Sequence, residues 1–86
     1  MLKIYGSRMC PDCVRCLNDL DEAGVAYEYF DFADSLRNLK EFLHIRETSA
    51  LFKEVVNKGK IGIPCIVDDY GSVNFSWEYY MEKSGQ

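Results

Sequence analysis

The sequence predicts an α/β domain in which a four-stranded mixed sheet carries helices on both faces, in the order β-α-β-α-α-β-β-α. Two observations predict this fold class. Short segments rich in aromatic and β-branched residues alternate with longer segments whose apolar residues recur at every third or fourth position. The 86 residues are 48% hydrophobic with only 6 Gly and 2 Pro, which suits one folded core and leaves no linker. We therefore expect a single domain over residues 1–86.

The first half of the chain predicts a strand, a helix and a second strand. Residues 2–5 form a short run that Gly6 interrupts, as is typical of a strand that ends in a loop. Apolar residues three and four positions apart predict a helix over 11–23, which ends before Gly24. Residues 25–32 carry Tyr on one face and Phe on the other, so we expect a second strand that is internal or sandwiched by helices.

The middle of the chain predicts two further helices. Asp34 or Ser35 caps the first and Thr48 or Ser49 the second, since a short polar side chain accepts a hydrogen bond from a free N–H of the first turn. Gly59 closes the second helix. Their apolar stripes are Leu36, Leu39, Phe42 and Leu43 in the first, and Leu51, Phe52, Val55 and Val56 in the second.

The end of the chain predicts a hairpin and a short helix. Residues 63–68 and 72–75 read as strands on either side of a turn at Tyr70, and Ser76 caps a helix over 77–83. A strand, crossover helix and strand are expected to be parallel, whereas a hairpin adds antiparallel strands. The sheet is therefore expected to be mixed.

Charge and hydropathy exclude several classes of protein. Fourteen acidic against 10 basic side chains give a net charge of -4, which disfavours a nucleic-acid partner. The longest apolar run, 63–67, has five residues where a membrane span needs roughly twenty. The N-terminus lacks the apolar segment of a secretory signal. We expect a cytoplasmic monomer with no membrane or nucleic-acid partner.

Three of the four cysteines lie within seven residues, as Cys10, Cys13 and Cys16 in the sequence CPDCVRC. Cysteines this close together in sequence cannot cross-link distant parts of a chain. The cysteine content of four in 86 residues is also below the roughly 8–10% that is typical of disulfide-rich scaffolds. In a reducing compartment such a cluster indicates redox chemistry or a metal. The metal alternative is a zinc or iron–sulfur module in which Cys65 completes a four-sulfur site with the cluster. The more ordinary interpretation of Cys16 is a small buried hydrophobe.

The first cysteine pair lies where the first strand meets the first helix. The N-terminus of a helix stabilises negative charge, which favours a thiolate at Cys10 and makes it the nucleophile. Cys13, one turn further on, is within reach of the Cys10 sulfur and is the resolving thiol. Pro11 fixes the backbone between them, while Asp12 adds a negative charge and Arg8 an opposing positive one.

CPDC at the start of a helix, followed some fifty residues later by Gly62-Ile63-Pro64 before a strand, resembles the glutaredoxin family of the thioredoxin fold. The resemblance implies a cis peptide bond before Pro64, which would lie beside Cys10. It also implies that the backbone of Ile63 pairs with an extended peptide or with glutathione.

The same resemblance implies a thiol–disulfide oxidoreductase that reduces protein or glutathione mixed disulfides at a redox-active centre and so serves electron transport and cell redox homeostasis. Its partners would be disulfide-containing proteins. Glutathione would be the co-substrate, and glutathione or a thioredoxin-reductase-type donor would restore the dithiol. No tightly bound cofactor is implied.

The chain departs from the resemblance between its last strand and last helix. Glutaredoxins that use glutathione typically carry Gly-Gly and paired Asp residues there, whereas this chain has residues 74–78, NFSWE. Backbone N–H groups of Ser76 and Trp77 can receive a carboxylate, but Glu78 adds a negative charge close by. Arg8 supplies the basic contact expected near the nucleophile. Three aromatic side chains are expected to rim the site: Tyr5, Tyr70 and Trp77.

Overall fold

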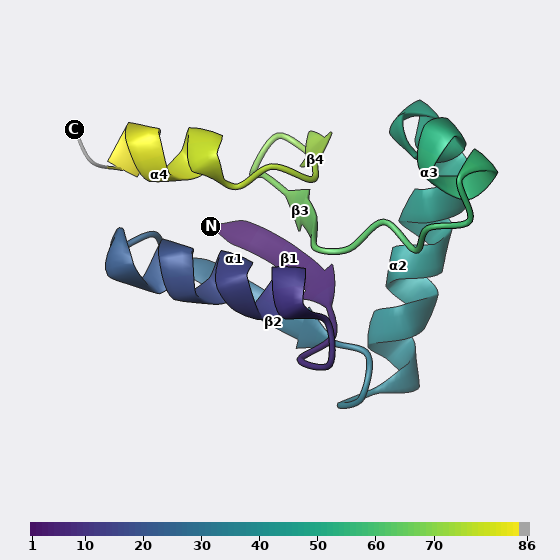
Figure 1. The fold of residues 1–86 in the computed structure, drawn as a ribbon, viewed down its shortest axis with the longest axis horizontal. Coiled ribbons are helices and arrows are strands. Elements are labelled where there is room, and N and C mark those ends of the chain that lie inside the picture. The colour runs from purple at the N-terminus through teal and green to yellow at the C-terminus, as the bar shows by residue number, and fades with distance from the viewer. Residues whose placement is uncertain (85–86) are drawn as a thin grey trace.

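A computed structural model describes residues 1–84 and contains a four-stranded mixed sheet (Figure 1). The strands are β1 (Leu2–Gly6), β2 (Tyr27–Asp31), β3 (Cys65–Val67) and β4 (Val73–Asn74). Their order across the sheet is β2-β1-β3-β4. β1 is parallel to β2, and the β1–β3 and β3–β4 pairs are antiparallel. The predicted parallel unit and terminal hairpin are both confirmed.

Helices cover both faces of this sheet, as predicted. They are α1 (Pro11–Glu22), α2 (Leu36–Thr48), the 3-10 turn η1 (Ala50–Phe52), α3 (Lys53–Asn57) and α4 (Glu78–Ser84). α1 and α4 contact each other and cover one face, while α2 and η1 cover the other (Figure 1). Within residues 1–84, no helix is long and apolar enough to cross a membrane.

β1 lies inside the sheet and separates two hydrophobic clusters. The α1 cluster has as its buried residues Leu2, Ile4, Cys16, Leu20 and Ile66. The α2 cluster has as its buried residues Tyr5, Phe42, Phe52 and Cys65. Ile4 and Tyr5 are neighbours in sequence but belong to different clusters, because successive side chains of a strand point to opposite faces. Burying apolar area in this way is the main favourable term that holds the two helical layers on the sheet.

The predicted strand over 25–32 is shorter and lies at the edge of the sheet, so of the two alternatives, internal or sandwiched by helices, the first is wrong and the second is confirmed. β2 pairs with β1 and has no second neighbour in the described sheet. The alternation itself is confirmed, because Tyr27 and Tyr29 pack against the α1 cluster while Phe30 and Phe32 pack against the α2 cluster. Partial cover on both faces, rather than a central position, explains the apolar composition of this strand.

The stripe predicted for α2 is partly wrong. Ser35 caps the helix as expected, its hydroxyl accepting a hydrogen bond from the Arg37 N–H at 3.0 Å. The core face is formed by Leu39, Phe42 and Ile45, whereas Leu36 is 77% exposed and Leu43 also faces solvent. Leu43 lies about 100° round the helix from Phe42, which turns it away from the sheet.

Three other elements differ from the prediction in their bounds. The second middle helix is divided into η1 and α3. Of the residues in these two elements only Phe52 is fully buried, and Leu51 and Val56 of the predicted stripe face solvent. β3 begins at Cys65 and not at residue 63, because Pro64 has no N–H to donate to the sheet. The last helix begins at Glu78, one residue later than predicted, which is within the usual uncertainty of helix ends.

Candidate functional site

Cys10 is the residue that precedes α1, with extended backbone angles (φ -94°, ψ 118°). Its N–H donates to the Ser7 carbonyl at 3.0 Å, and its own carbonyl accepts from the Val14 N–H at 3.1 Å, the first bond of the helix. Pro11 occupies the first helical position, where a missing N–H removes no needed donor. The Cys10 side chain is partly exposed. A thiol is therefore presented to solvent at the N-terminus of α1, as predicted.

Cys13 lies one turn further along α1 and is completely buried. Burial is the main reason that the pKa of Cys13 is raised to about 12. A hydrogen bond with the Ser7 backbone lowers the pKa, while a hydrogen bond with Cys10 and the electrostatic effect of Cys10 raise it further. Its sulfur packs against Gly6, where an added Cβ would lie only 2.7 Å from it. The structure thus brings the two thiols of CPDC together, with Cys13 protonated at neutral pH.

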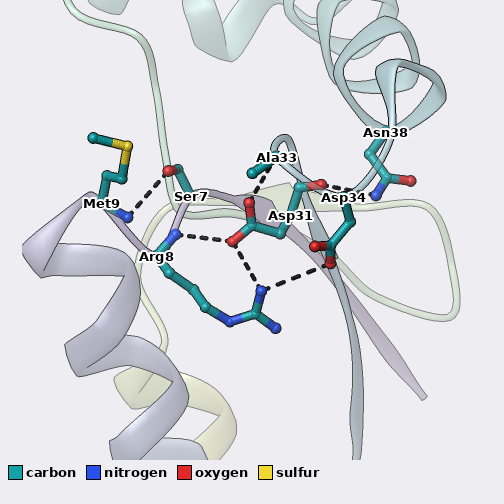
Figure 2. Close-up of polar contacts among 7 residues, drawn as sticks. All are labelled: Ser7, Arg8, Met9, Asp31, Ala33, Asp34 and Asn38. Carbon is teal, nitrogen blue, oxygen red and sulfur yellow. Dashed lines mark hydrogen bonds and ion pairs between the residues drawn. The ribbon is translucent and has the colours of Figure 1, made fainter.

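Asp31, at the end of β2, anchors the loop that leads to Cys10 (Figure 2). It is 1% exposed, and its carboxylate accepts hydrogen bonds from the backbone N–H groups of Arg8 at 2.9 Å and Ala33 at 2.8 Å. The Arg8 guanidinium approaches the same carboxylate at 3.4 Å, and Asn38 donates to the Asp31 carbonyl at 2.9 Å. The Asp31 side chain therefore ties the loop after β1 to the end of β2, and its backbone carbonyl adds a contact with the start of α2.

The surroundings of Asp31 keep it ionised. Burial alone would raise the pKa of this carboxyl, but the N–H groups of Ala33 and Arg8 outweigh burial and the net pKa is lowered. The Tyr29 hydroxyl adds to this electrostatically, although its geometry falls short of a hydrogen bond with any described group. The charge of Arg8 contributes in the same direction.

The two charges expected beside the Cys10 thiolate have other partners. The Arg8 guanidinium faces Asp31 and lies 3.7 Å from Asp34, as Figure 2 shows. It also lies 5.1 Å from the centre of the Tyr29 ring. Asp12 pairs with Arg15 one turn along α1. Arg8 and Asp12 therefore both have ion-pair partners other than Cys10, although Asp12 also lines the groove beside Cys10.

Cys10 opens into a groove of about 710 Å³. One wall comes from the loop and first turn around Cys10, and the other from α3, the segment between α3 and β3, and Phe75 after β4. The lining residues are Ser7, Met9, Cys10, Asp12, Val55, Gly59, Lys60, Ile61, Gly62, Ile63 and Phe75. Two segments nearly fifty residues apart in sequence thus meet at one thiol.

The predicted pair Ile63-Pro64 reaches this groove in part. The peptide bond between the two residues is cis, as the resemblance implies. Ile63 lines the groove, whereas Pro64 is buried. Of the other predicted site residues, Cys10 and Asp12 line the groove. Among the described residues, Arg8, Pro11, Ser76 and Trp77 are not in its lining.

Ser76 and Trp77 are engaged elsewhere. The Ser76 N–H, expected to receive a carboxylate, already donates to the Asn74 side chain at 3.0 Å, and the Ser76 hydroxyl donates to Glu78. The indole N–H of Trp77 donates to Asp19 on α1 at 2.8 Å, and the ring packs on the α1 cluster. The structure therefore gives Trp77 the role of joining α4 to α1, which corrects its placement at the rim.

The other two aromatic side chains expected at the rim also lie elsewhere. Tyr5 is buried in the α2 cluster and donates to Glu41 at 3.2 Å. Tyr70 is 92% exposed in the β3–β4 turn. Neither lines the groove as the structure describes it.

Cys16 and Cys65 lie in different clusters on opposite faces of the sheet. Both are completely buried, and burial raises the pKa of each thiol to about 12. The four cysteines therefore do not surround one point. Across residues 1–84, no group of three or more His, Cys, Asp or Glu side chains is placed to hold a metal ion. The interpretation of Cys16 as a buried hydrophobe is confirmed.

The sequence interpretation missed Asp31 and Gly6. These residues face each other in the parallel register of β1 and β2. The signal was present: Asp31 ends an aromatic strand, and a parallel neighbour brings that end to the same sheet edge as the end of β1, where Cys10 follows. Aligning the ends of the two predicted strands, at residues 5 and 32, brings Asp31 to this edge of the sheet but misses the observed register, in which Tyr5 pairs with Phe30.

Comparison with curated proteins finds a relative in Haemophilus influenzae (strain ATCC 51907 / DSM 11121 / KW20 / Rd), described as an uncharacterized protein. The two chains are 34% identical over 70 residues, which cover 81% of each. This chain belongs to the same family as that protein. No family model matches the chain, and no solved structure matches it.

Proposed function

We propose that the protein is a glutaredoxin-like thiol–disulfide oxidoreductase with a thioredoxin-like fold. The observation that carries the proposal is the pairing of a partly exposed Cys10, at a helix N-terminus and in a groove, with a buried Cys13 one turn beneath it. The strand order and the position of this pair between β1 and α1 support the fold assignment.

In the proposed reaction, the Cys10 thiolate attacks one sulfur of a substrate disulfide, and the other substrate sulfur leaves as a thiolate. Cys13 then attacks the Cys10 sulfur, the bond to substrate breaks, and the second substrate sulfur leaves. The substrate gains two electrons, the Cys10–Cys13 pair loses them, and the protons of the two cysteines pass to the released thiolates.

The environments of the two thiols suit these roles. Cys10 immediately precedes the first turn of α1, and the first turn of a helix has N–H groups without intrahelical partners. The pKa of Cys13, raised mainly by burial, keeps this thiol protonated when the substrate arrives, so it does not compete as the attacking group, and it gives up its proton as it attacks Cys10. A glutathione or thioredoxin-reductase-type donor would then reduce the pair, and protein disulfides would be the substrates.

The proposal is tested by reducing an insoluble protein disulfide and a small neutral disulfide with three variants. Cys10→Ser is expected to abolish both reactions. Cys13→Ser is expected to accumulate a mixed disulfide at Cys10, visible by intact mass. The matched control is Cys16→Ala, because Cys16 lies on the same helix but is buried in the α1 cluster. Equal activity in the wild type and the Cys10→Ser protein would overturn the proposal.

A further inference from the structure

The groove beside Cys10 exposes large apolar side chains on both walls. Met9, which immediately precedes Cys10, is 92% exposed, and Ile61 on the opposite wall is 58% exposed. Val55, Ile63 and Phe75 complete an apolar lining between them. Apolar side chains gathered around a reactive thiol, and not scattered over the surface, are typical of an interaction site.

The wall that carries Ile61 is fixed before anything binds. The Arg46 guanidinium donates to the Ile61 carbonyl at 3.0 Å and to the Lys60 carbonyl at 2.9 Å. The next residue, Gly62, has φ +96°, and a Cβ there would lie 2.6 Å from the Phe52 ring. Contacts from α2 and from the α2 cluster therefore hold Ile61 in place. Binding of a ligand then costs little free energy for ordering this wall.

The charges around the groove do not match glutathione. At neutral pH glutathione carries two carboxylates and one ammonium group, so it needs at least two cationic or N–H-rich contacts. Among the described residues, the lining contains one basic side chain, Lys60, and one acidic side chain, Asp12. The guanidinium of Arg8 faces Asp31 and Asp34.

One of the two backbone donors expected to receive a glutathione carboxylate, the Ser76 N–H, is also occupied. The Ser76 N–H donates to Asn74, and Glu78 supplies its own carboxylate at the start of α4. An extended peptide segment, by contrast, carries no backbone charge and presents side chains on alternate sides. Leucine-like side chains on either side of its cysteine match Met9 and Ile61 in chemistry.

We propose that this groove selects protein disulfides whose cysteine is flanked by apolar residues in an extended segment, in preference to glutathione disulfides. This inference rests on the proposed function and uses the same two exchange steps at Cys10 and Cys13. The apolar flanks bind between Met9 and Ile61 while the substrate disulfide lies at Cys10.

The test uses the pre-reduced full-length protein in single turnover, so no external reductant takes part. Four disulfide probes are compared: oxidised glutathione, bis(2-hydroxyethyl) disulfide, and the disulfide dimers of two neutral blocked pentapeptides with either leucine or serine on both sides of the cysteine. Each second-order rate is divided by the rate of the same probe with dithiothreitol, which removes differences in intrinsic reactivity. The leucine peptide is expected to react about tenfold faster than the serine peptide and oxidised glutathione.

Ile61→Ser tests the groove directly. It is expected to lower the normalised rate of the leucine peptide by about tenfold and that of the serine peptide by less than twofold. Leu36→Ser is the matched control, because Leu36 is an exposed aliphatic residue (77%, against 58% for Ile61) that does not line the groove. It should leave the leucine preference unchanged.

The outcomes separate this inference from the proposed function. Three results would overturn the inference: oxidised glutathione reacts as fast as the leucine peptide or faster, the leucine peptide is not preferred, or its preference survives Ile61→Ser. In each case, Cys10-dependent reduction of bis(2-hydroxyethyl) disulfide would still support the proposed function. If no probe reacts in a Cys10-dependent way, the proposed function itself fails.

Discussion

Two short segments precede helices in this molecule, and they are held in different ways. The loop before α1, residues 7–10, is held by Asp31, a buried carboxylate from a strand more than twenty residues away (Figure 2). The turn before α4, residues 74–78, is held by Asn74 and Glu78, which belong to the turn itself. The first segment carries the candidate nucleophile, and the second carries no residue that lines the groove except Phe75.

The two segments differ in whether the polar contacts that hold them are buried or exposed to solvent. A buried carboxylate that accepts two backbone N–H groups stabilises strongly, because removing it leaves donors without a partner away from water. Exposed local contacts compete with water and contribute little. The position of Cys10 should therefore depend on Asp31 much more than the position of α4 depends on its own turn.

The largest effect is expected from Asp31→Asn, which keeps the shape of the side chain but replaces one acceptor oxygen with a donor. We expect a loss of about 2–4 kcal/mol in the free energy of unfolding, measured by urea denaturation at pH 7. Asp34→Asn is the control, since Asp34 is exposed and pairs with Arg8 only at 3.7 Å. Its expected loss is about 0.5 kcal/mol or less. Equal losses in the two variants would contradict the comparison.

A second large effect is expected from Gly6→Ala. The added Cβ would lie 2.7 Å from the Cys13 sulfur and 3.4 Å from the Tyr29 hydroxyl, and we expect about 1–3 kcal/mol of destabilisation. Repeating the substitution in a Cys13→Ala background removes the closest contact. The cost of Gly6→Ala should fall in that background, as a double-mutant cycle of urea midpoints would show. An unchanged cost would mean that the contact with Cys13 is not the cause.

Asp31 also predicts a pH dependence. Its pKa is lowered in the folded protein from about 3.9 in the unfolded chain, so its contribution is fully present above pH 4 and is lost as the pH falls through the folded value. The difference in unfolding free energy between the wild type and Asp31→Asn should shrink as the pH is lowered from 7 to 3. A series of urea titrations at constant ionic strength measures it. Two parallel stability curves would contradict this assignment.

The smallest effect is expected in the turn before α4. Asn74→Ala removes the acceptor of the Ser76 N–H at a site open to water, and we expect a loss of about 0.5–1 kcal/mol. Glu78→Gln should shift the melting temperature less than Asn74→Ala does, because the Glu78 side chain lies in solvent. If either change matched Asp31→Asn, the two segments would be held equally firmly and the comparison would fail.

Much of the fold follows from local patterns in the sequence. The period of the apolar residues gives α1 and its buried Cys13, Cys16 and Leu20, and the turn at Tyr70 gives the hairpin. The edge position of β2 could not be predicted in this way. Aromatic residues on both faces of a strand are explained equally by a central strand and by an edge strand covered from two sides.

The candidate site was predictable only where it is local. Cys10 and Cys13 are one helical turn apart, so their proximity follows from the sequence. The partners of Arg8 depend on the register between β1 and β2, which no local pattern specifies. The groove depends on Arg46 holding the carbonyls of residues 60 and 61, a contact made by a side chain on another helix.

The contiguous unit from β1 to β2 also has a consequence for the order of synthesis. It contains Cys10, Cys13 and Asp31, all within residues 2–31, whereas the opposite wall of the groove begins only at Val55. On the ribosome, the thiol pair and its anchoring carboxylate emerge before any of that wall has been made. Under the proposed function, a nascent chain therefore carries the candidate nucleophile before the wall that is proposed to select its substrates has been translated.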